Sequence, residues 1–329
     1  MSLSTSYLGL RLSTPLVVGA SPFADSVPLA QSLEDFGAGA IVMRSLFEEQ
    51  IYLAALAAAP TPRPGFPAQP DLVRSFPPPA EYQLSPERYL AQIRALKAEL
   101  AIPVIASLNG CRPGGWLDYA AQFEKAGADA IEINLYQVAA DGAVSALEVE
   151  AEMLEAVRLA RASIKIPLAV KISPFLTSPL NFCRQLEKVG ADGVVLFNRF
   201  YQAGIDLEEE RDELKLELSE PSELLLRLRW ISLLAPNFQG TIAASGGIHG
   251  GKDAIKAIAS GAHAVQVVSV LLRHGPRVLA TLLAGVSQWM SAHGYAGVSD
   301  LRGTQSRKGL DPAGEERADY QRLLQAWRV

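Results

Sequence analysis

Two hydrophobic patterns alternate along the chain. Short runs of branched apolar residues recur eight times, and stretches with apolar residues three and four positions apart lie between them, as at Tyr89, Ile93, Leu96 and Leu100. The short runs are typical of buried parallel strands, and the longer stretches of helices that cover a sheet. The runs are PLVVGAS from Pro15, AIVMRS from Ala40, IPVIASLNG from Ile102, DAIEINLY from Asp129, IPLAVKIS from Ile166, DGVVLFNR from Asp192, GTIAASGG from Gly240 and AVQVVS from Ala264.

Eight strands that alternate with helices indicate a β/α barrel. Four predicted helix-to-strand junctions repeat one motif, FGAGAIV, AGADAIEI, VGADGVVL and SGAHAVQV, in which a glycine can end the helix in a left-handed conformation. Such barrels run to about 250 residues before insertions. We therefore predict one domain over residues 1–329, a (β/α)8 TIM barrel with lid insertions and a C-terminal extension.

Two insertions interrupt the repeat, at about residues 50–84 and 199–220. The first contains the segment from Pro60 to Pro79, which holds eight of the 21 prolines, and we expect a stiffened loop that acts as a lid. A surface excursion without a catalytic role is the alternative. In the second insertion, the pieces DLEEE and LKLELS are expected to pair as a small hairpin. The stretch after Trp289 forms the extension.

The charge of the chain is concentrated in one segment. Net charge is −5, and the segment from Asp206 to Glu220 alone carries eight acidic and two basic residues, or −6, which leaves the remainder at +1. We interpret this segment as a solvated hairpin and find no basic stripe for nucleic acid. No apolar stretch approaches the ~18 residues that span a bilayer, and the N-terminus lacks a basic signal, so we expect a cytoplasmic protein.

Cysteine and histidine give no sign of a metal centre. Cys111 and Cys183 are too few for a disulfide scaffold or a metal cage and fit a reducing compartment. The four histidines show no ligand-like spacing with carboxylates, so we propose no metal site.

Polar or small residues end several of the predicted strands. In a closed parallel barrel these ends meet at one mouth, where such barrels build their active sites. Amides at two of these positions, Asn134 and Asn198, offer a donor and an acceptor each and suit the edge of an imide-like ring. A satisfied structural amide is the alternative for either one. The residues at the strand ends are Ser21, Arg44, Asn109, Asn134, Lys171, Asn198 and the triplet Ser245-Gly246-Gly247.

Lys171 lies at the end of an otherwise apolar strand and cannot readily reach water, so it needs an anionic or electron-rich partner. A flavin fits, because its ring gains negative charge on reduction and an ammonium stabilises that charge. A Schiff-base lysine and a lysine at the barrel rim remain alternatives.

A glycine-rich turn follows the seventh predicted strand. Gly246 and Gly247 let backbone N–H groups approach a phosphate, and the helix predicted to follow adds positive potential. Loops after strands seven and eight of a barrel often bind phosphate together, which adds Ser269. A purely conformational role for the glycines is the alternative.

These residues together resemble the FMN-dependent dihydroorotate dehydrogenase family, and within it the divergent dihydroorotate dehydrogenase-like group. The resemblance spans the barrel and implies a CH–CH oxidoreductase that carries FMN, with pyrimidine biosynthesis as the family's setting. It rests on Ala20-Ser21, on Arg44-Ser45 where the family usually has Lys-Ser, on the Glu-Ile-Asn run that ends at Asn134, on Lys171, on Asn198, and on the Ser245-Gly246-Gly247-Ile248 turn.

The resemblance also implies roles for individual residues. The flavin ring and ribityl chain are expected near Ala20, Ser21, Asn134 and Lys171. The guanidinium of Arg44 is expected to place a positive charge near the flavin. Gly246, Gly247 and Ser269 are expected to hold the phosphate. The full predicted cofactor set is Ala20, Ser21, Arg44, Ser45, Asn109, Asn134, Lys171, Ser245, Gly246, Gly247 and Ser269, with Asn134 and Asn198 at the substrate.

The chain departs from the family pattern after Asn134. Where the family has a loop with a cysteine or serine base, this chain reads LYQVAADG, and Gln137, which cannot act as a base, falls at that place. An asparagine-rich loop expected after strand two is replaced by the proline-rich segment. Substitutes for the base, beside Lys171 in the catalytic set, are Tyr136 and Cys111, with Asp141 and Tyr201 as further candidates.

We therefore expect an FMN oxidoreductase that acts on a small planar polar compound, with dihydroorotate as the substrate that the resemblance names. Three rivals remain: a flavoenzyme with another substrate, a non-catalytic flavin-binding protein that docks a partner through its acidic hairpin, and a lyase that uses Lys171 without flavin. The chain has neither a dinucleotide fingerprint nor an iron–sulfur cysteine cluster, so its electron acceptor is expected to be diffusible or a partner redox protein. A homodimer is the default assembly.

Overall fold

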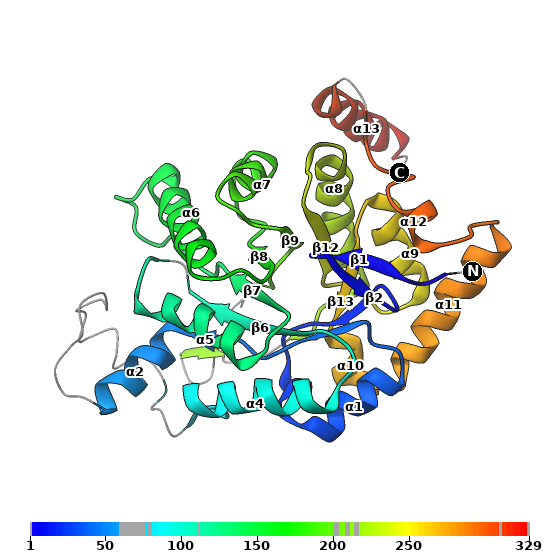
Figure 1. Cartoon of the computed structure of the whole chain (residues 1–329). Helices are drawn as coiled ribbons and strands as arrows, with labels where there is room; N and C mark the ends of the chain where they lie inside the picture. The colour runs from blue at the N-terminus through cyan, green and yellow to red at the C-terminus, as the bar shows by residue number, and fades with distance from the viewer. Residues whose placement is uncertain are drawn as a thin grey trace.

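Eight parallel strands close into a barrel in the computed structural model, which describes residues 2–58, 77, 81–110, 112–199, 204–207, 211–213, 217–308 and 311–327 (Figure 1). The pairing runs β3-β4-β6-β7-β8-β9-β12-β13 and returns to β3, so the predicted (β/α)8 barrel is confirmed. The strands are β3 (Leu16–Val18), β4 (Ala40–Val42), β6 (Val104–Asn109), β7 (Ala130–Asn134), β8 (Leu168–Ile172), β9 (Gly193–Leu196), β12 (Thr241–Ser245) and β13 (Ala264–Val267).

Helices surround this barrel on its outer face (Figure 1). The junction glycines predicted from the repeat adopt positive φ, as at Gly127 with φ 101°, where the glycine ends a helix and the chain turns into β7. The helices are α1 (Val27–Asp35), α2 (Glu48–Ala58), α4 (Pro86–Glu99), α5 (Asp118–Ala126), α6 (Ala146–Ser163), α7 (Pro179–Lys188), α8 (Leu224–Leu234), α9 (Gly251–Ser260), α10 (Ser269–His274), α11 (Val278–Ala292), α12 (Val298–Leu301) and α13 (Pro312–Ala326).

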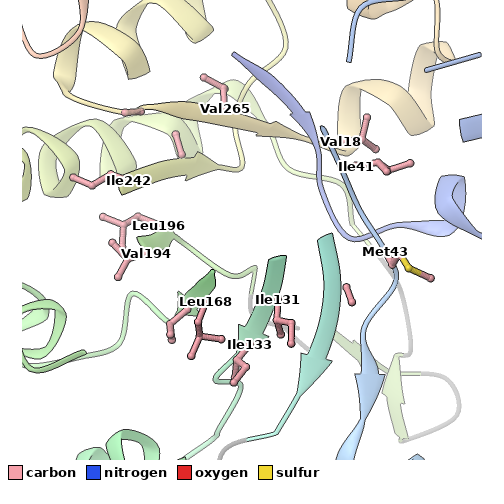
Figure 2. Packing of buried hydrophobic residues seen from close by; sticks show 14 of the residues in the cluster. Val18, Ile41, Met43, Ile131, Ile133, Leu168, Val194, Leu196, Ile242 and Val265 are labelled. Carbon is pink, nitrogen blue, oxygen red and sulfur yellow. The ribbon is translucent and has the colours of Figure 1, made fainter. Parts of the chain in front are cut away.

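The core has two parts, because successive residues of a strand point to opposite faces. Side chains that point outward, such as Ile131 and Ile133 of β7, pack under the helices (Figure 2). Side chains that point inward form a second cluster of small residues, among them Ala130, Ala169 and Ala243. The barrel interior is therefore narrow and apolar in its lower half.

A hairpin of β1 (Thr5–Tyr7) and β2 (Leu10–Leu12) closes the N-terminal end of the barrel. Tyr7, Leu8 and Leu12 belong to the inner apolar cluster, and the backbone N–H of Leu8 donates to Thr241 Oγ1 at the start of β12. The N-terminal segment is thus a plug, and the opposite end of the barrel is the mouth.

The insertions differ in part from expectation. Helix α2 occupies the start of the first insertion, after the short strand β5 (Leu46–Phe47), where we expected only a loop; the proline-rich stretch itself lies outside the described residues, apart from the exposed Pro77. The hairpin in the second insertion pairs β10 (Gly204–Asp206) with β11 (Arg211–Glu213), not the DLEEE and LKLELS pieces. The backbone register pairs Gly204 with Glu213 and Asp206 with Arg211.

The C-terminal extension ends in α13, which the view in Figure 1 shows apart from the barrel. Ion pairs attach it, with Arg307 Nη1 at 2.9 Å from Glu316 Oε1 and Arg229 also paired with Glu316. No helix in the described ranges is long and apolar enough to cross a membrane.

Candidate active site

The mouth of the barrel brings together most of the strand-end residues singled out in the sequence. Asn109, Asn134 and Lys171 are consecutive partners in the register of β6, β7 and β8. Asn198 follows β9, and its backbone N–H donates to Ile172 O at the end of β8. Because all eight strands run in the same direction, these side chains share one end of the barrel.

Lys171 is buried, with 7% of its surface exposed, and it already has partners within the protein. Its Nζ donates to Gln266 Oε1 on β13 at 3.0 Å and lies 3.7 Å from Glu132 Oε1 on β7. Gln266 Nε2 in turn donates to the other oxygen of Glu132. The anionic partner that Lys171 needs is therefore supplied first by a carboxylate of the chain itself.

A second polar network crosses the mouth between β4, β6 and β7. Asn134 Nδ2 donates to Ser45 Oγ at 2.7 Å and lies 3.2 Å from Ser107 Oγ, and the two serine hydroxyls are 2.8 Å apart. These contacts fix the direction of the amide. Asn134 Oδ1 is buried and has no hydrogen-bond partner among the described residues.

The polar residues that follow β3 and β4 differ in whether the protein itself supplies their partners. Ser21 is 4% exposed, and its Oγ has no hydrogen-bond partner in the described part of the chain, while Ala20 packs against the inner apolar cluster. Arg44 is paired with Asp25, with Nη2 at 2.7 Å from Oδ2. The charge of Arg44 is therefore offset locally, whereas we expected it to act as a cation toward the cofactor.

The glycine turn after β12 packs closely on its neighbours. Gly246 and Gly247 have φ angles of 96° and 77°, in the region that favours glycine. A Cβ on Gly247 would collide with the backbone nitrogen of Leu224 at the start of α8. The backbone conformation and the close packing thus require glycine at these positions. Polar groups lie at the same turn.

Those polar groups converge on Ser219. The Gly247 N–H donates to Ser219 Oγ at 3.3 Å, and Ser219 donates to Ser269 Oγ from its hydroxyl at 2.8 Å and from its backbone N–H at 3.0 Å. His249 Nε2 lies 2.7 Å from Ser219 O. A small region at the mouth therefore concentrates N–H and O–H donors from three loops.

A buried arginine supports the same turn from below. Arg227 on α8 is 5% exposed; its Nε donates to Ser245 O at 2.9 Å and its Nη1 donates to Glu223 O at 2.8 Å. A Cβ on Gly246 would lie 3.0 Å from its Nη2. Burial, opposed by Glu223, lowers the pKa of Arg227 from its usual high value.

The candidates for a base are dispersed. Tyr136 and Gln137 follow β7 and are half-buried, and Gln137 Oε1 has no partner among the described residues. Asp141 is exposed and accepts the Ala143 N–H at 2.9 Å within a turn, which places it in solvent. Cys111 and Tyr201 lie outside the described residues.

Sequence reasoning missed four residues of the site: Glu132, Gln266, Ser219 and Arg227. The first two carry a usable signal, since Glu132 precedes Asn134 by two positions and must share its inward face. Gln266 likewise stands inside an otherwise apolar strand. Ser219 lies in a loop and Arg227 on a helix. Only the tertiary packing brings them to the mouth, so the sequence gives no local signal for either residue.

Comparison with known proteins places the chain beside one family. The sequence model of the family described as dihydroorotate dehydrogenase matches residues 80–290. A catalytic subunit of dihydroorotate dehydrogenase B (NAD(+)) from Pyrococcus abyssi is 27% identical over 319 residues, which cover 92% of this chain and 98% of that protein. A protein of the same name from Pelobacter propionicus is 28% identical over 224 residues, which cover 66% of this chain and 73% of that protein. Another from Methanosarcina acetivorans is 25% identical over 309 residues, which cover 90% of this chain and 93% of that protein.

Proposed function

Because the chain belongs to the dihydroorotate dehydrogenase family, we propose that it is an FMN-dependent oxidoreductase that acts on the CH–CH bond of a small, planar, polar compound at the barrel mouth. The observation that carries this proposal is the set of buried polar atoms in and after the barrel strands that the described part of the protein leaves without hydrogen-bond partners. Asn134, which carries one of these atoms, is the register partner of Lys171 on the neighbouring strand.

The unpartnered atoms suit a flavin ring. Ser21 Oγ, Asn134 Oδ1 and Gln137 Oε1 are buried without hydrogen bonds from the described residues. A buried polar atom without a partner costs roughly 1–3 kcal/mol, so such atoms are normally satisfied by a ligand or by water. The polar edge of a flavin carries both N–H and C=O groups that can meet a hydroxyl and two amide oxygens.

The donors around Ser219 suit the FMN phosphate. Ser219 joins these donors: its hydroxyl accepts from the Gly247 N–H, and its hydroxyl and backbone N–H both donate to Ser269 Oγ. Serine hydroxyls can turn toward an anion, and the backbone N–H groups of a glycine turn bind phosphate oxygens well. We therefore add Ser219 to the residues expected to hold the phosphate, which are Gly246, Gly247 and Ser269.

When bound, the flavin supplies the acceptor for two electrons and a hydrogen from the substrate. Lys171 stabilises the negative charge that develops at the mouth, and Asn134 and Asn198 orient the planar substrate through their amides. The substrate's remaining proton needs a base. Among the described candidates Tyr136 lies closest in sequence to the family's base position. We propose that Tyr136, once its phenol has released its own proton to solvent, accepts this proton at Oη as the phenolate.

Dihydroorotate is the substrate that the relatives' names indicate, and we expect this chain to oxidise it slowly. Gln137 stands where the family carries its base, and loss of a general base commonly costs ~10²–10⁴-fold in rate. Another small cyclic or unsaturated compound is therefore expected to reduce the protein faster. We further propose that the electron acceptor is diffusible or a partner redox protein.

The charge pair of Lys171 argues against the Schiff-base alternative. Attack on a carbonyl needs a free amine, and Lys171 Nζ is already engaged by Gln266 Oε1 at 3.0 Å and by Glu132 Oε1 at 3.7 Å. A non-catalytic flavin-binding role is left as an outcome of the experiment.

The test is anaerobic reduction of the purified, FMN-loaded protein, followed by the flavin absorbance. We expect FMN to co-purify and the colour to bleach with a small cyclic imide or unsaturated acid, faster than with dihydroorotate. A loaded protein that no such compound bleaches, but that chemical reductants do, would be a binder. Failure to bind FMN at all would overturn the proposal.

A further inference from the structure

We propose that Glu132 and Gln266 are positioning residues, which hold the Lys171 ammonium in a fixed place at the barrel mouth and thereby set how strongly the site favours a reduced flavin. This inference rests on the proposed function for its redox part. The charge pair itself can be tested without a cofactor.

The three side chains come from three strands and meet inside the barrel. Glu132 and Gln266 are each 1% exposed. Gln266 bridges the pair, because its carbonyl oxygen accepts from Lys171 Nζ at 3.0 Å and its amide donates to the Glu132 carboxylate. A flipped amide would present N–H groups to the ammonium and oxygen to the carboxylate. The two charges therefore fix the orientation of Gln266.

Gly19 follows β3 and lies beside this bridge. A Cβ on Gly19 would lie 2.8 Å from Val268 Cγ2 and 3.4 Å from Gln266 Oε1. The Gln266 amide thus lies close to the Gly19 backbone and has polar contacts at both ends. Such packing keeps the ammonium in one place, which a flexible lysine would not achieve alone.

Below the cluster the barrel offers no other compensation for charge among the described residues. The inner cluster beneath is apolar and joins the hairpin plug to barrel residues such as Ile105, Ala130 and Val195. Tyr7 faces Glu132 from that plug; burial first, and then the Glu132 charge, raise the pKa of its phenol, which stays neutral. Glu132 and Lys171 therefore depend on each other, because an isolated buried charge is strongly unfavourable.

Lys171 keeps capacity for a ligand in this arrangement. An ammonium has three N–H donors, and Gln266 accepts from one of them. A reduced flavin beside Lys171 would add negative charge near Glu132 as well. Glu132 thus limits the stabilisation that Lys171 gives, and an unpaired Glu132 would oppose reduction outright.

The test is a double-mutant cycle with K171M, E132Q and the double variant. K171M leaves a buried carboxylate without its partner, whereas the double variant removes both charges. We expect K171M to lower the folded-to-unfolded ratio of the apo protein by roughly 100-fold or more, and the double variant to recover most of that loss. Among the FMN-loaded wild type, K171M and the double variant, the midpoint potential of the flavin should be most negative in K171M, intermediate in the double variant and highest in the wild type.

The matched control is the exposed pair Arg158–Glu155 on α6, whose charged atoms lie 2.6 Å apart with side chains 53% and 44% exposed. The corresponding cycle with R158M and E155Q should show a coupling of no more than about fivefold. It reports how much coupling a solvent-exposed ion pair gives even when its charged atoms lie closer together than those of Lys171 and Glu132.

Two outcomes decide the proposal. Additive effects of K171M and E132Q on apo stability would overturn the positioning role, whatever the protein does with FMN. If K171M does not accumulate as folded protein, the folding of the double variant becomes the readout: a folded double variant supports the pair, and an equally unfolded one overturns it. Coupling in the apo protein together with absent FMN binding would instead count against the proposed function alone.

Discussion

Asn134 Nδ2 donates to Ser45 Oγ at 2.7 Å, which turns the Asn134 carbonyl oxygen away from the serines of β4 and β6. The amide is therefore oriented before a ligand binds, with a donor committed to the protein and an acceptor left over. Such preorganisation lowers the entropy that binding must overcome.

We predict that N134A weakens FMN binding by roughly tenfold or more while it lowers the free energy of unfolding of the apo protein by only about 1 kcal/mol. The small stability loss is expected because Ser45 and Ser107 hydroxyls, 2.8 Å apart, still satisfy each other. Flavin fluorescence quenching gives the affinity, and urea denaturation gives the stability. An affinity equal to that of the wild type would remove Asn134 from the cofactor set. S45A serves as the comparison, because it keeps the Asn134 carbonyl oxygen but removes the hydrogen bond that holds the Asn134 amide in place.

We predict that G247A destabilises the protein much more than G294A. Both glycines have positive φ, 77° and 75°, so both substitutions add strain of about 1–2 kcal/mol. A Cβ at Gly247 also meets the Leu224 backbone, whereas a Cβ at Gly294 meets nothing within 4 Å. Thermal unfolding of the two variants measures the difference, and equal melting temperatures would show that the turn can move aside.

We predict a loss of stability between about pH 6.5 and pH 4 that depends on His263. Burial, and secondarily Arg302, lower the pKa of this histidine to about 4, and its Nδ1 accepts the Ile242 N–H at 3.1 Å. The unfolded chain takes up the proton near pH 6.5, before the folded chain does, so protonation favours unfolding as the pH falls through this window. The upper bound of the loss is about 3 kcal/mol.

The measurement for His263 is urea denaturation at several pH values. H263N keeps an acceptor for the Ile242 N–H but cannot titrate, so its stability should change less than that of the wild type from pH 6.5 to pH 4. Parallel curves for the two proteins would assign the acid limb to other groups.

We predict that Cys183 resists alkylation in the folded protein. The thiol is 1% exposed beneath α7, and burial raises its pKa to about 12, so its thiolate fraction at pH 8 is roughly 1000-fold below that of an ordinary cysteine. Iodoacetamide treatment followed by peptide mass spectrometry should leave Cys183 unmodified until urea is added. Rapid modification in buffer would mean that α7 opens.

The fold could be predicted because its signals are local. A branched apolar run such as IPLAVKIS is strand-like without reference to the rest of the chain, and a junction glycine such as Gly127 has one conformational reason to be there. The closure of the barrel follows from the repetition of these signals eight times. The strands of the β10–β11 hairpin differ from the pieces predicted to pair, because several registers are compatible with one composition.

The site was predicted as a set of positions but not as a set of contacts. Lys171 was expected to meet a cofactor, and the structure gives it Glu132 and Gln266. Arg44 was expected to act toward the cofactor, and the structure gives it Asp25. Pairing of this kind is decided by which strands become neighbours and by side-chain direction. Neither can be deduced from the residues that flank a charged residue in the sequence.

The hairpin that closes the barrel has an electrical consequence for the mouth. Coulomb attraction varies inversely with the effective dielectric constant, and admission of water beneath Glu132 would move that constant from about 20 toward 80, which weakens the attraction to Lys171 up to ~fourfold. Tyr7 and Leu8 keep that space dry from the far end of the barrel. Truncation of the first twelve residues would therefore act as an active-site mutation, although none of them lies at the mouth.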